Sequence, residues 1–154
     1  FSFRLGYNTI EQDIAKGTKQ PPLNFHLRNG EMLSWNPGHY PPYENYGYPM
    51  AVDTHVFRSE FILPILQQLQ FRTPNELETQ LQQFRHKITT MKSFTNSIAV
   101  NIPANNLSGI THSDNYSDID RLNDLFLVGQ RIDLDYIQKQ KVVGCHQKIP
   151  LNMI

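Results

Sequence analysis

The chain alternates apolar and polar residues in three stretches, the pattern typical of half-buried β-strands. These are residues 1–5 (FSFRL), residues 49–58 (PMAVDTHVFR) and the run NSIAVNIP, which ends at Pro103. The Asn29-Gly30 pair separates two short runs in NFHLRNGEMLSW, and this arrangement predicts a tight hairpin. The pattern therefore predicts a sheet with at least one antiparallel pair.

Helical periodicity is clearest after Thr73. Thr73 at the N-cap, Pro74 at the first helical position and Glu76 three residues after the threonine form a capping box. The apolar residues that follow share one helical face, which predicts packing on an apolar surface: Leu77, Leu81, Phe84 and Ile88.

Three further helices are expected from capping residues. Ser59 can cap EFILPILQQLQ, which Pro64 limits or bends; Ser117 or Asp118 can cap IDRLNDLFLVG, closed by Gly129; and Asp133 can cap LDYIQKQ. Residues 6–22 and 104–117 are polar and are expected to be loops. Strands and helices mixed without strict alternation predict an α/β domain, with a partly antiparallel mixed sheet and flanking helices.

Length and composition narrow the class of protein. With 154 residues the chain suits a single domain, residues 1–154. Lys plus Arg equals Asp plus Glu at 14 each, which argues against a nucleic-acid partner or an anionic membrane surface. One cysteine, Cys145, forms no internal disulfide, which favours a cytoplasmic location, and the sequence contains neither a transmembrane run nor a signal segment. A strand pattern beginning at Phe1 leads us to expect further structure upstream; the alternative is the processed terminus of a mature protein.

Several side chains could carry chemistry. Asp53 and His55, two apart on an expected strand, would leave the same face and could share a metal ion or a substrate hydroxyl; the alternative is a backbone-bonded Asp and a core His. Glu76 has a capping role, which leaves Glu78 as either a general base or a solvated helix carboxylate. His112 in a polar loop could bind a metal ion or be merely solvated.

Three further sequence features could indicate a site: two D-x-D strings, the Cys145-His146 pair and a loop rich in tyrosine. The D-x-D strings at 118–120 and 133–135 open expected helices, where Asp is favoured as a cap, although D-x-D also binds cations beside diphosphates. Cys145 next to His146 lacks an identifiable third group that would make it a nucleophile. The loop GHYPPYENYGYP, residues 38–49, carries four tyrosines whose flat apolar faces and polar tips suit partly hydrated ligands such as sugars or bases.

The order of four segments resembles the C-terminal half of bacterial glycosyltransferases of the GT-A type, close to family 2 and to a group common in cyanobacteria. The segments are FSFRLGYNT, YGYPMAVDTHVFRSEFILPIL, FRTPNELETQL and NIPANNLSGITHSDNYSDIDRLNDLFLVGQRIDL. The match runs almost from end to end, and its specificity lies in shared order and spacing. Thr54 stands where the pattern has Gly, and no Asp follows Glu78.

The resemblance implies a truncated glycosyltransferase whose nucleotide-binding half, with its metal-binding D-x-D at a strand end, lies upstream. The sheet edge at Phe1 to Leu5 would then be open, and we expect an upstream segment or a partner chain to cover it. The implied substrates are a nucleotide-sugar donor and a glycan acceptor, with a divalent cation (Mn²⁺ or Mg²⁺) held mostly by the missing half. Glu78 and Asp53 would be catalytic, and His112 would be a metal ligand. Tyr40 and Tyr43 would line the acceptor side, together with the substrate-binding residues Trp35, Tyr46, Tyr48 and His55. The alternative is a non-catalytic carbohydrate-binding or structural module, with the tyrosines covering the sheet edge.

Overall fold

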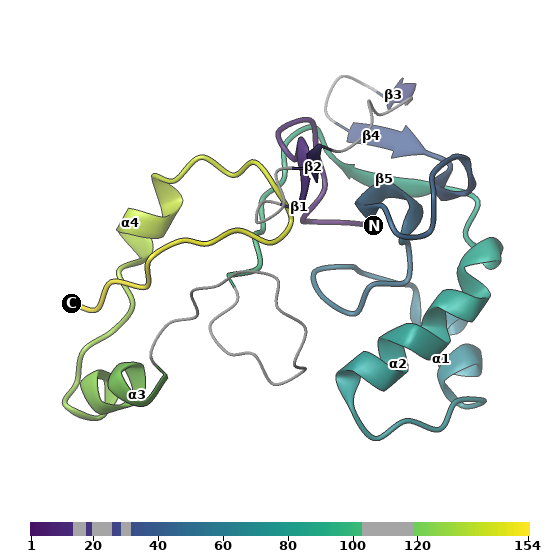
Figure 1. Ribbon diagram of the computed structural model, residues 1–154. Coiled ribbons are helices and arrows are strands. Elements are labelled where there is room, and N and C mark those ends of the chain that lie inside the picture. Colours follow the sequence, from purple (N-terminus) through teal and green to yellow (C-terminus); the bar gives the residue numbers. More distant parts are fainter. Residues whose placement is uncertain (14–17, 20–25, 29–31, 103–118) are drawn as a thin grey trace.

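The structure of the chain, a computed structural model, describes residues 1–13, 18–19, 26–28, 32–102 and 119–154 (Figure 1). In this part of the chain the strands form two antiparallel sheets: β1 (Glu11–Asp13) with β2 (Thr18–Lys19), and β4 (Met32–Trp35) between β3 (His26–Arg28) and β5 (Met91–Phe94). The helices are α1 (Ser59–Leu66), α2 (Pro74–Leu81), α3 (Ile119–Leu127) and α4 (Leu134–Gln138). Short 3₁₀ helices are η1 (Pro37–His39), η2 (Asn45–Gly47) and η3 (Gln82–Lys87).

The hairpin predicted from Asn29-Gly30 is confirmed in its strands. β3 and β4 pair antiparallel with Arg28 opposite Met32, while the turn residues themselves lie outside the described part of the chain. The prediction that residues 6–22 are only loop is wrong, because β1 and β2 lie within them. Those strands are too short for an alternating pattern to reveal.

Residues Phe1 to Leu5 lie between β5 and residues 54–56 rather than at an open edge. The Ser2 amide donates to the Lys92 carbonyl at 2.8 Å, and the Phe3 amide donates to the Thr54 carbonyl at 3.0 Å. Ser2 is paired parallel with Ser93 and antiparallel with His55 as isolated bridges. The expected strand is therefore reduced to one bridged residue, and the expected open edge at Phe1 to Leu5 is filled by the chain itself.

The strand expected over residues 49–58 does not form. Thr54 has a φ of +55°, a left-handed conformation that interrupts any extended run. Pro49, Met50 and Ala51 are buried in succession, which alternation does not allow. The strand expected up to Pro103 is likewise reduced to a single parallel bridge between Asn101 and His146.

The capping predictions are confirmed for α2, α4 and the end of α3. The Thr73 hydroxyl accepts a hydrogen bond from the Glu76 amide at 3.2 Å, and Asp133 accepts one from the Tyr136 amide at 2.9 Å. Gly129 follows α3 with a φ of +98°. Residues 117 and 118, the expected N-cap of α3, lie outside the described residues, as does the expected loop at 104–117.

Helix α1 differs slightly from the expectation. Arg58 occupies its N-cap position and makes no side-chain capping bond, so Ser59 is the first helical residue instead of the cap. Pro64 lies inside the helix, as the sequence indicated.

Two apolar clusters form the core. The first, which we call the sheet cluster, combines residues of β4, β5 and the loop that follows β4 with one residue from each end of the chain: Leu5, Leu33, Trp35, Tyr40, Tyr46, Met91 and Cys145. The second, the helix cluster, joins α1 and α2 through Met50, Ile65 and Leu81. Ile88 packs against both clusters and so links the sheet to the helices.

Helices α3 and α4 lie on the opposite side of the molecule from α1 and α2 (Figure 1). Isolated parallel bridges between Glu11 and Gly144 and between Asn101 and His146 connect the C-terminal segment to the remainder. No helix in the described residues has the length and apolar character needed to cross a membrane. The named sheets are small and antiparallel, with parallel pairing only at single bridges, so this architecture does not by itself display a GT-A fold.

Candidate functional site

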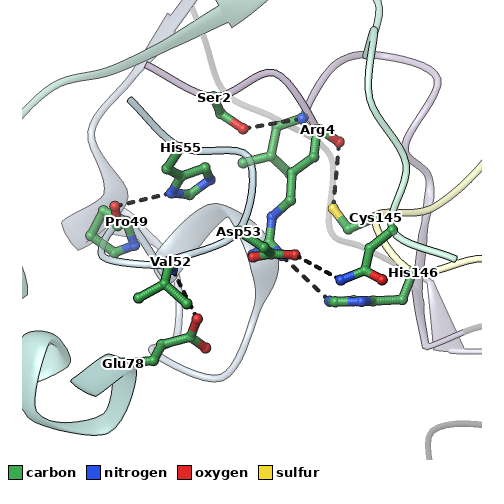
Figure 2. A network of polar contacts seen from close by, with 11 residues as sticks. Ser2, Arg4, Pro49, Val52, Asp53, His55, Glu78, Cys145 and His146 are labelled. Atoms are coloured by element: carbon green, nitrogen blue, oxygen red, sulfur yellow. Dashed lines mark hydrogen bonds and ion pairs between the residues drawn. The ribbon is translucent and has the colours of Figure 1, made fainter. Parts of the chain in front are cut away.

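The candidate site is built around the loop of residues 48–55, which passes between α2 and the segment Phe1 to Leu5. Met50 and Ala51 are fully buried, and Met50 belongs to the helix cluster, which fixes the loop to α1 and α2. Beyond them the chain carries Val52, Asp53 and His55 toward groups from distant parts of the sequence (Figure 2). The left-handed turn at Thr54 means that Asp53 and His55 do not present one strand face, as the sequence had suggested.

Asp53 is engaged in a salt bridge with Arg4. The Arg4 Nη1 atom lies 2.6 Å from Oδ1 and 2.7 Å from Oδ2 of Asp53. The Arg4 side chain is 4% exposed and that of Asp53 is 26% exposed. The side-chain amide nitrogen of Asn101, Nδ2, donates to Asp53 Oδ2 at 3.2 Å. His146 Nε2 lies 3.4 Å from Arg4 Nη1. Asp53 therefore joins three distant segments of the chain.

The charge state of Asp53 follows from these neighbours. Burial alone would raise the pKa of Asp53, but the Arg4 guanidinium, the Asn101 amide and His146 together hold that pKa below its usual range. Both oxygens already accept hydrogen bonds. A carboxylate so arranged is a weak proton acceptor, which makes a structural role for Asp53 more natural than general-base catalysis.

His55 is a neutral, largely buried imidazole. Its Nδ1 lies 3.2 Å from the Pro49 carbonyl oxygen, which assigns the proton to Nδ1. Burial, and next the positive charge of Arg4, lower the pKa of His55 to about 3. Its Nε2 is buried and has no hydrogen-bond partner in the described structure. His55 thus matches the core-histidine alternative better than an exposed sugar contact.

Glu78 lies on α2 and faces the 48–55 loop. Its Oε2 atom accepts a hydrogen bond from the Val52 amide at 2.9 Å. Burial, and next the adjacent Glu78 carboxylate, raise the pKa of the Tyr48 hydroxyl. Glu78 also accepts hydrogen bonds, from the Val52 amide and from the Tyr48 hydroxyl, but in the described structure it lacks the arginine partner that Asp53 has, so it can accept a proton from a substrate hydroxyl more readily than Asp53.

Glu76 performs the capping task that the sequence predicted, with one difference. Its Oε2 accepts from the amide of Arg72, one residue before the N-cap, at 2.7 Å, and its Oε1 lies 3.2 Å from the Arg72 guanidinium. These contacts with the Arg72 backbone and side chain lower the pKa of Glu76. Glu76 and Glu78 each accept a backbone amide, so α2 offers two comparable carboxylates in different settings.

The tyrosines divide between core and surface. Tyr46 is 4% exposed, its hydroxyl donates to the Gly6 carbonyl at 3.1 Å, and burial raises its pKa to about 12. Trp35 is 3% exposed and donates its indole N–H to the Tyr46 carbonyl at 3.0 Å. Tyr40 packs on Tyr46, with 5.6 Å between ring centroids. The expectation that Trp35, Tyr40 and Tyr46 line an acceptor surface is not met, because all three fill the sheet cluster.

Tyr43 and Tyr48 remain as surface candidates. Tyr43 is 76% exposed, and Tyr48 is half-buried beside Glu78. His112 lies outside the described residues, so its expected metal-binding role is not placed. Within the residues that are described, no three His, Cys, Asp or Glu side chains gather closely enough to hold a metal ion.

Cys145 has no features of a reactive nucleophile. It is 1% exposed, its Sγ lies 3.5 Å from the Arg4 carbonyl, and burial raises the pKa of its thiol to about 11. Thiolate formation is therefore disfavoured near neutral pH. The D-x-D string at 133–135 is accounted for by the capping bond of Asp133.

A surface hollow of about 620 Å³ lies elsewhere, between the end of α1 and the start of α2. Its lining residues are Leu69, Gln70, Phe71, Arg72, Glu76 and Gln80. Glu78 lies about 200° around the helix from Glu76 and so faces away from this hollow.

The sequence did not indicate Arg4, Asn101 or His146 as site residues. The alternating pattern of Phe1 to Leu5 placed its polar residues on the solvent side, whereas Ser2 is 0% and Arg4 3% exposed. A single arginine in a short apolar stretch was the available signal, since such a residue needs a carboxylate partner when it is buried.

Comparison with known proteins adds no relative. No protein-family model, no curated protein and no solved structure matches the chain.

Proposed function

We propose that the chain is the acceptor-side part of a glycosyltransferase, which transfers a sugar from a nucleotide-sugar donor to a carbohydrate-type acceptor, with Glu78 as the general base. The observation that carries the proposal is the setting of Glu78. Its carboxylate is held by the Val52 amide at 2.9 Å on an α-helix and lies beside Tyr48. The resemblance in segment order supplies the reaction class.

In this proposal the acceptor hydroxyl gives its proton to Glu78 as its oxygen attacks the sugar carbon that bears the diphosphate. The bond between that carbon and the diphosphate oxygen breaks, and the nucleoside diphosphate leaves with the electron pair. Tyr48 would orient the acceptor next to Glu78. As the resemblance implies, the nucleotide and most ligands of the divalent cation would belong to the upstream nucleotide-binding half, and His112 is our candidate ligand from this chain.

The test compares two variants on the same helix. Glu78→Gln should lower the turnover of sugar transfer by about two orders of magnitude, the usual contribution of a general base. Glu76→Gln should retain most of the activity, since the glutamine oxygen can still accept the Arg72 amide. In each variant the amide oxygen can replace the carboxylate oxygen as an acceptor, so both should keep the fold.

The measurement is the rate at which the full-length enzyme, including the nucleotide-binding half that the proposal implies, transfers sugar from a nucleotide-sugar donor. Circular dichroism confirms that each variant is folded. Equal losses in the two variants would leave Glu78 without a catalytic role. A larger loss in Glu76→Gln would move the base to that residue.

A second candidate function is carbohydrate binding without catalysis. The exposed rings of Tyr43 and Phe71, 76% and 44% exposed, favour it, and Phe71 borders the hollow at the start of α2. Oligosaccharides that shifted the amide NMR signals around these rings, without nucleotide or metal ion, would favour this function over transfer.

A further inference from the structure

We propose that Arg4 and Asp53 are positioning residues for Glu78: their ion pair fixes the 48–55 loop so that the Val52 amide holds the Glu78 carboxylate. This inference rests on the proposed role of Glu78 and replaces the catalytic role that the sequence suggested for Asp53. Figure 2 shows the ion pair on one side of the loop and Glu78 on the other.

Arg4 is the fixed end of this arrangement. It is 3% exposed, and its neighbours in the chain are bound on both sides. The Phe3 amide donates to the Thr54 carbonyl at 3.0 Å, and the Leu5 amide donates to the Ser2 hydroxyl at 3.2 Å. The Arg4 guanidinium therefore presents Nη1 to Asp53 from a backbone that is held in place.

Asp53 carries this constraint to the loop. Its carboxylate takes two contacts from Arg4 and one from Asn101, and its backbone immediately follows Val52. The Val52 amide is the donor to Glu78 Oε2 at 2.9 Å. The amide that orients the proposed base and the anchored carboxylate thus belong to consecutive residues, Val52 and Asp53.

The loop needs such an anchor because its backbone is strained. Thr54, next to Asp53, is a β-branched residue at a φ of +55°. Such conformations persist only where the surrounding contacts impose them. Asp53 directly precedes Thr54, and its ion pair with Arg4 holds the backbone at this point. Loss of the ion pair should therefore let the loop relax and move the Val52 amide away from Glu78.

The test uses two amide protons that each report on one carboxylate. An amide hydrogen-bonded to a carboxylate changes its NMR chemical shift as that carboxylate is protonated. In the unaltered protein the Val52 amide should follow Glu78 and the Arg72 amide should follow Glu76, its partner at 2.7 Å. Glu78→Gln should remove the pH dependence at Val52 alone, which separates Glu78 from the other charged groups around it, namely Asp53, Tyr48 and Arg4.

Asp53→Asn should abolish the carboxylate-linked shift at Val52 and leave the shift at Arg72 unchanged. A general loss of stability would weaken both signals, so Arg72 serves as an internal control in the same molecule. Arg4→Lys keeps the positive charge and should retain part of the shift at Val52; it also provides a second variant if Asp53→Asn does not fold. A Val52 amide that still followed Glu78 in Asp53→Asn, or in Arg4→Lys as fully as in the unaltered protein, would overturn the proposal.

Turnover provides a separate result. Asp53→Asn should lower turnover about tenfold or more with little change in KM, because a small displacement of a catalytic group has effects of this size. If the NMR results agree with the proposal and no sugar transfer is found, the positioning of Glu78 stands and the proposed function fails. If transfer occurs and Val52 is unaffected in Asp53→Asn, the positioning role alone fails.

Discussion

Thr54 adopts a backbone conformation that its side chain disfavours. It is the single residue other than glycine with a positive φ in the described chain, and its Oγ1 atom is buried without a hydrogen-bond partner. Glycine adopts this conformation at no steric cost. The threonine therefore holds this turn at an energetic cost that a glycine would not incur.

Thr54→Gly should accordingly stabilise the protein. The strain of a β-branched residue at this φ is about 1–3 kcal/mol, while glycine loses about 0.5–1 kcal/mol through greater freedom of the unfolded chain. The net gain should be about 1 kcal/mol in the free energy of unfolding, measured in urea. Thr54→Ala is the matched control, because it removes the unpaired hydroxyl but keeps the Cβ. A Thr54→Gly protein no more stable than Thr54→Ala would show that the backbone is not strained.

His55 should make stability depend on pH. Its folded-state pKa is lowered by burial to about 3, whereas an unfolded histidine titrates near pH 6.5. Between these values the unfolded chain binds a proton that the folded chain does not, so the free energy of unfolding falls as the pH falls through this window. One proton changes that free energy by about 1.4 kcal/mol per pH unit.

The comparison is between the unaltered protein and His55→Asn. From about pH 7 to about pH 5 the unaltered protein should lose about 2 kcal/mol more than the variant, because asparagine has no proton to bind. Urea unfolding at the two pH values measures this difference. Equal losses would mean that His55 binds a proton as readily in the folded protein as in the unfolded chain.

At the scale of elements, capping residues close together in the sequence predicted the helices well, whereas the strands, whose partners are distant in the sequence, could not be predicted reliably. The cap at Thr73 is confirmed because its hydroxyl and the Glu76 amide are three residues apart, and their geometry needs no other part of the chain. The strand over residues 49–58 was wrong because alternation cannot reveal a left-handed turn imposed by distant contacts.

The candidate site was predicted in the same uneven way. Separating Glu78 from Glu76 by capping agrees with the structure, in which the two carboxylates accept different backbone amides. Trp35 and Tyr46 were misplaced because an aromatic ring with a polar tip suits a sugar surface and a hydrogen-bonded core equally well. Arg4 and Asn101 reach Asp53 across 49 and 48 residues, and no short motif reports contacts of that kind.

At the scale of the whole molecule, the site depends on two clusters remaining in register. Glu78 belongs to the helix cluster side and Arg4 to the sheet side, and the 48–55 loop crosses between them. Ile88 packs against both clusters, and the Arg85 guanidinium lies 3.4 Å from the Gly47 carbonyl, from which the loop begins. These contacts predict that sheet and helices unfold together as one cooperative unit.

Ile88→Ala tests this coupling. Removing a partly buried isoleucine side chain should cost about 2 kcal/mol, at the low end for core truncations because Ile88 is only half-buried. The folded-state NMR signals of Leu33 in β4 and Leu81 in α2, followed through a urea titration, report on the two clusters separately. Both should disappear at the same urea concentration in the unaltered protein, and at the same lower concentration in Ile88→Ala, since the backbone pairing of residues 1–3 with 54–56 still joins the two parts.

Leu134→Ala, at a side chain that is 63% exposed, is the control and should change stability by less than about 0.5 kcal/mol. If Ile88→Ala lowered the urea concentration at which the Leu33 signal disappears but not that of the Leu81 signal, the two clusters would unfold as separate units. The contacts across the 48–55 loop would then be too weak to hold Glu78 in place relative to Arg4 and Asp53.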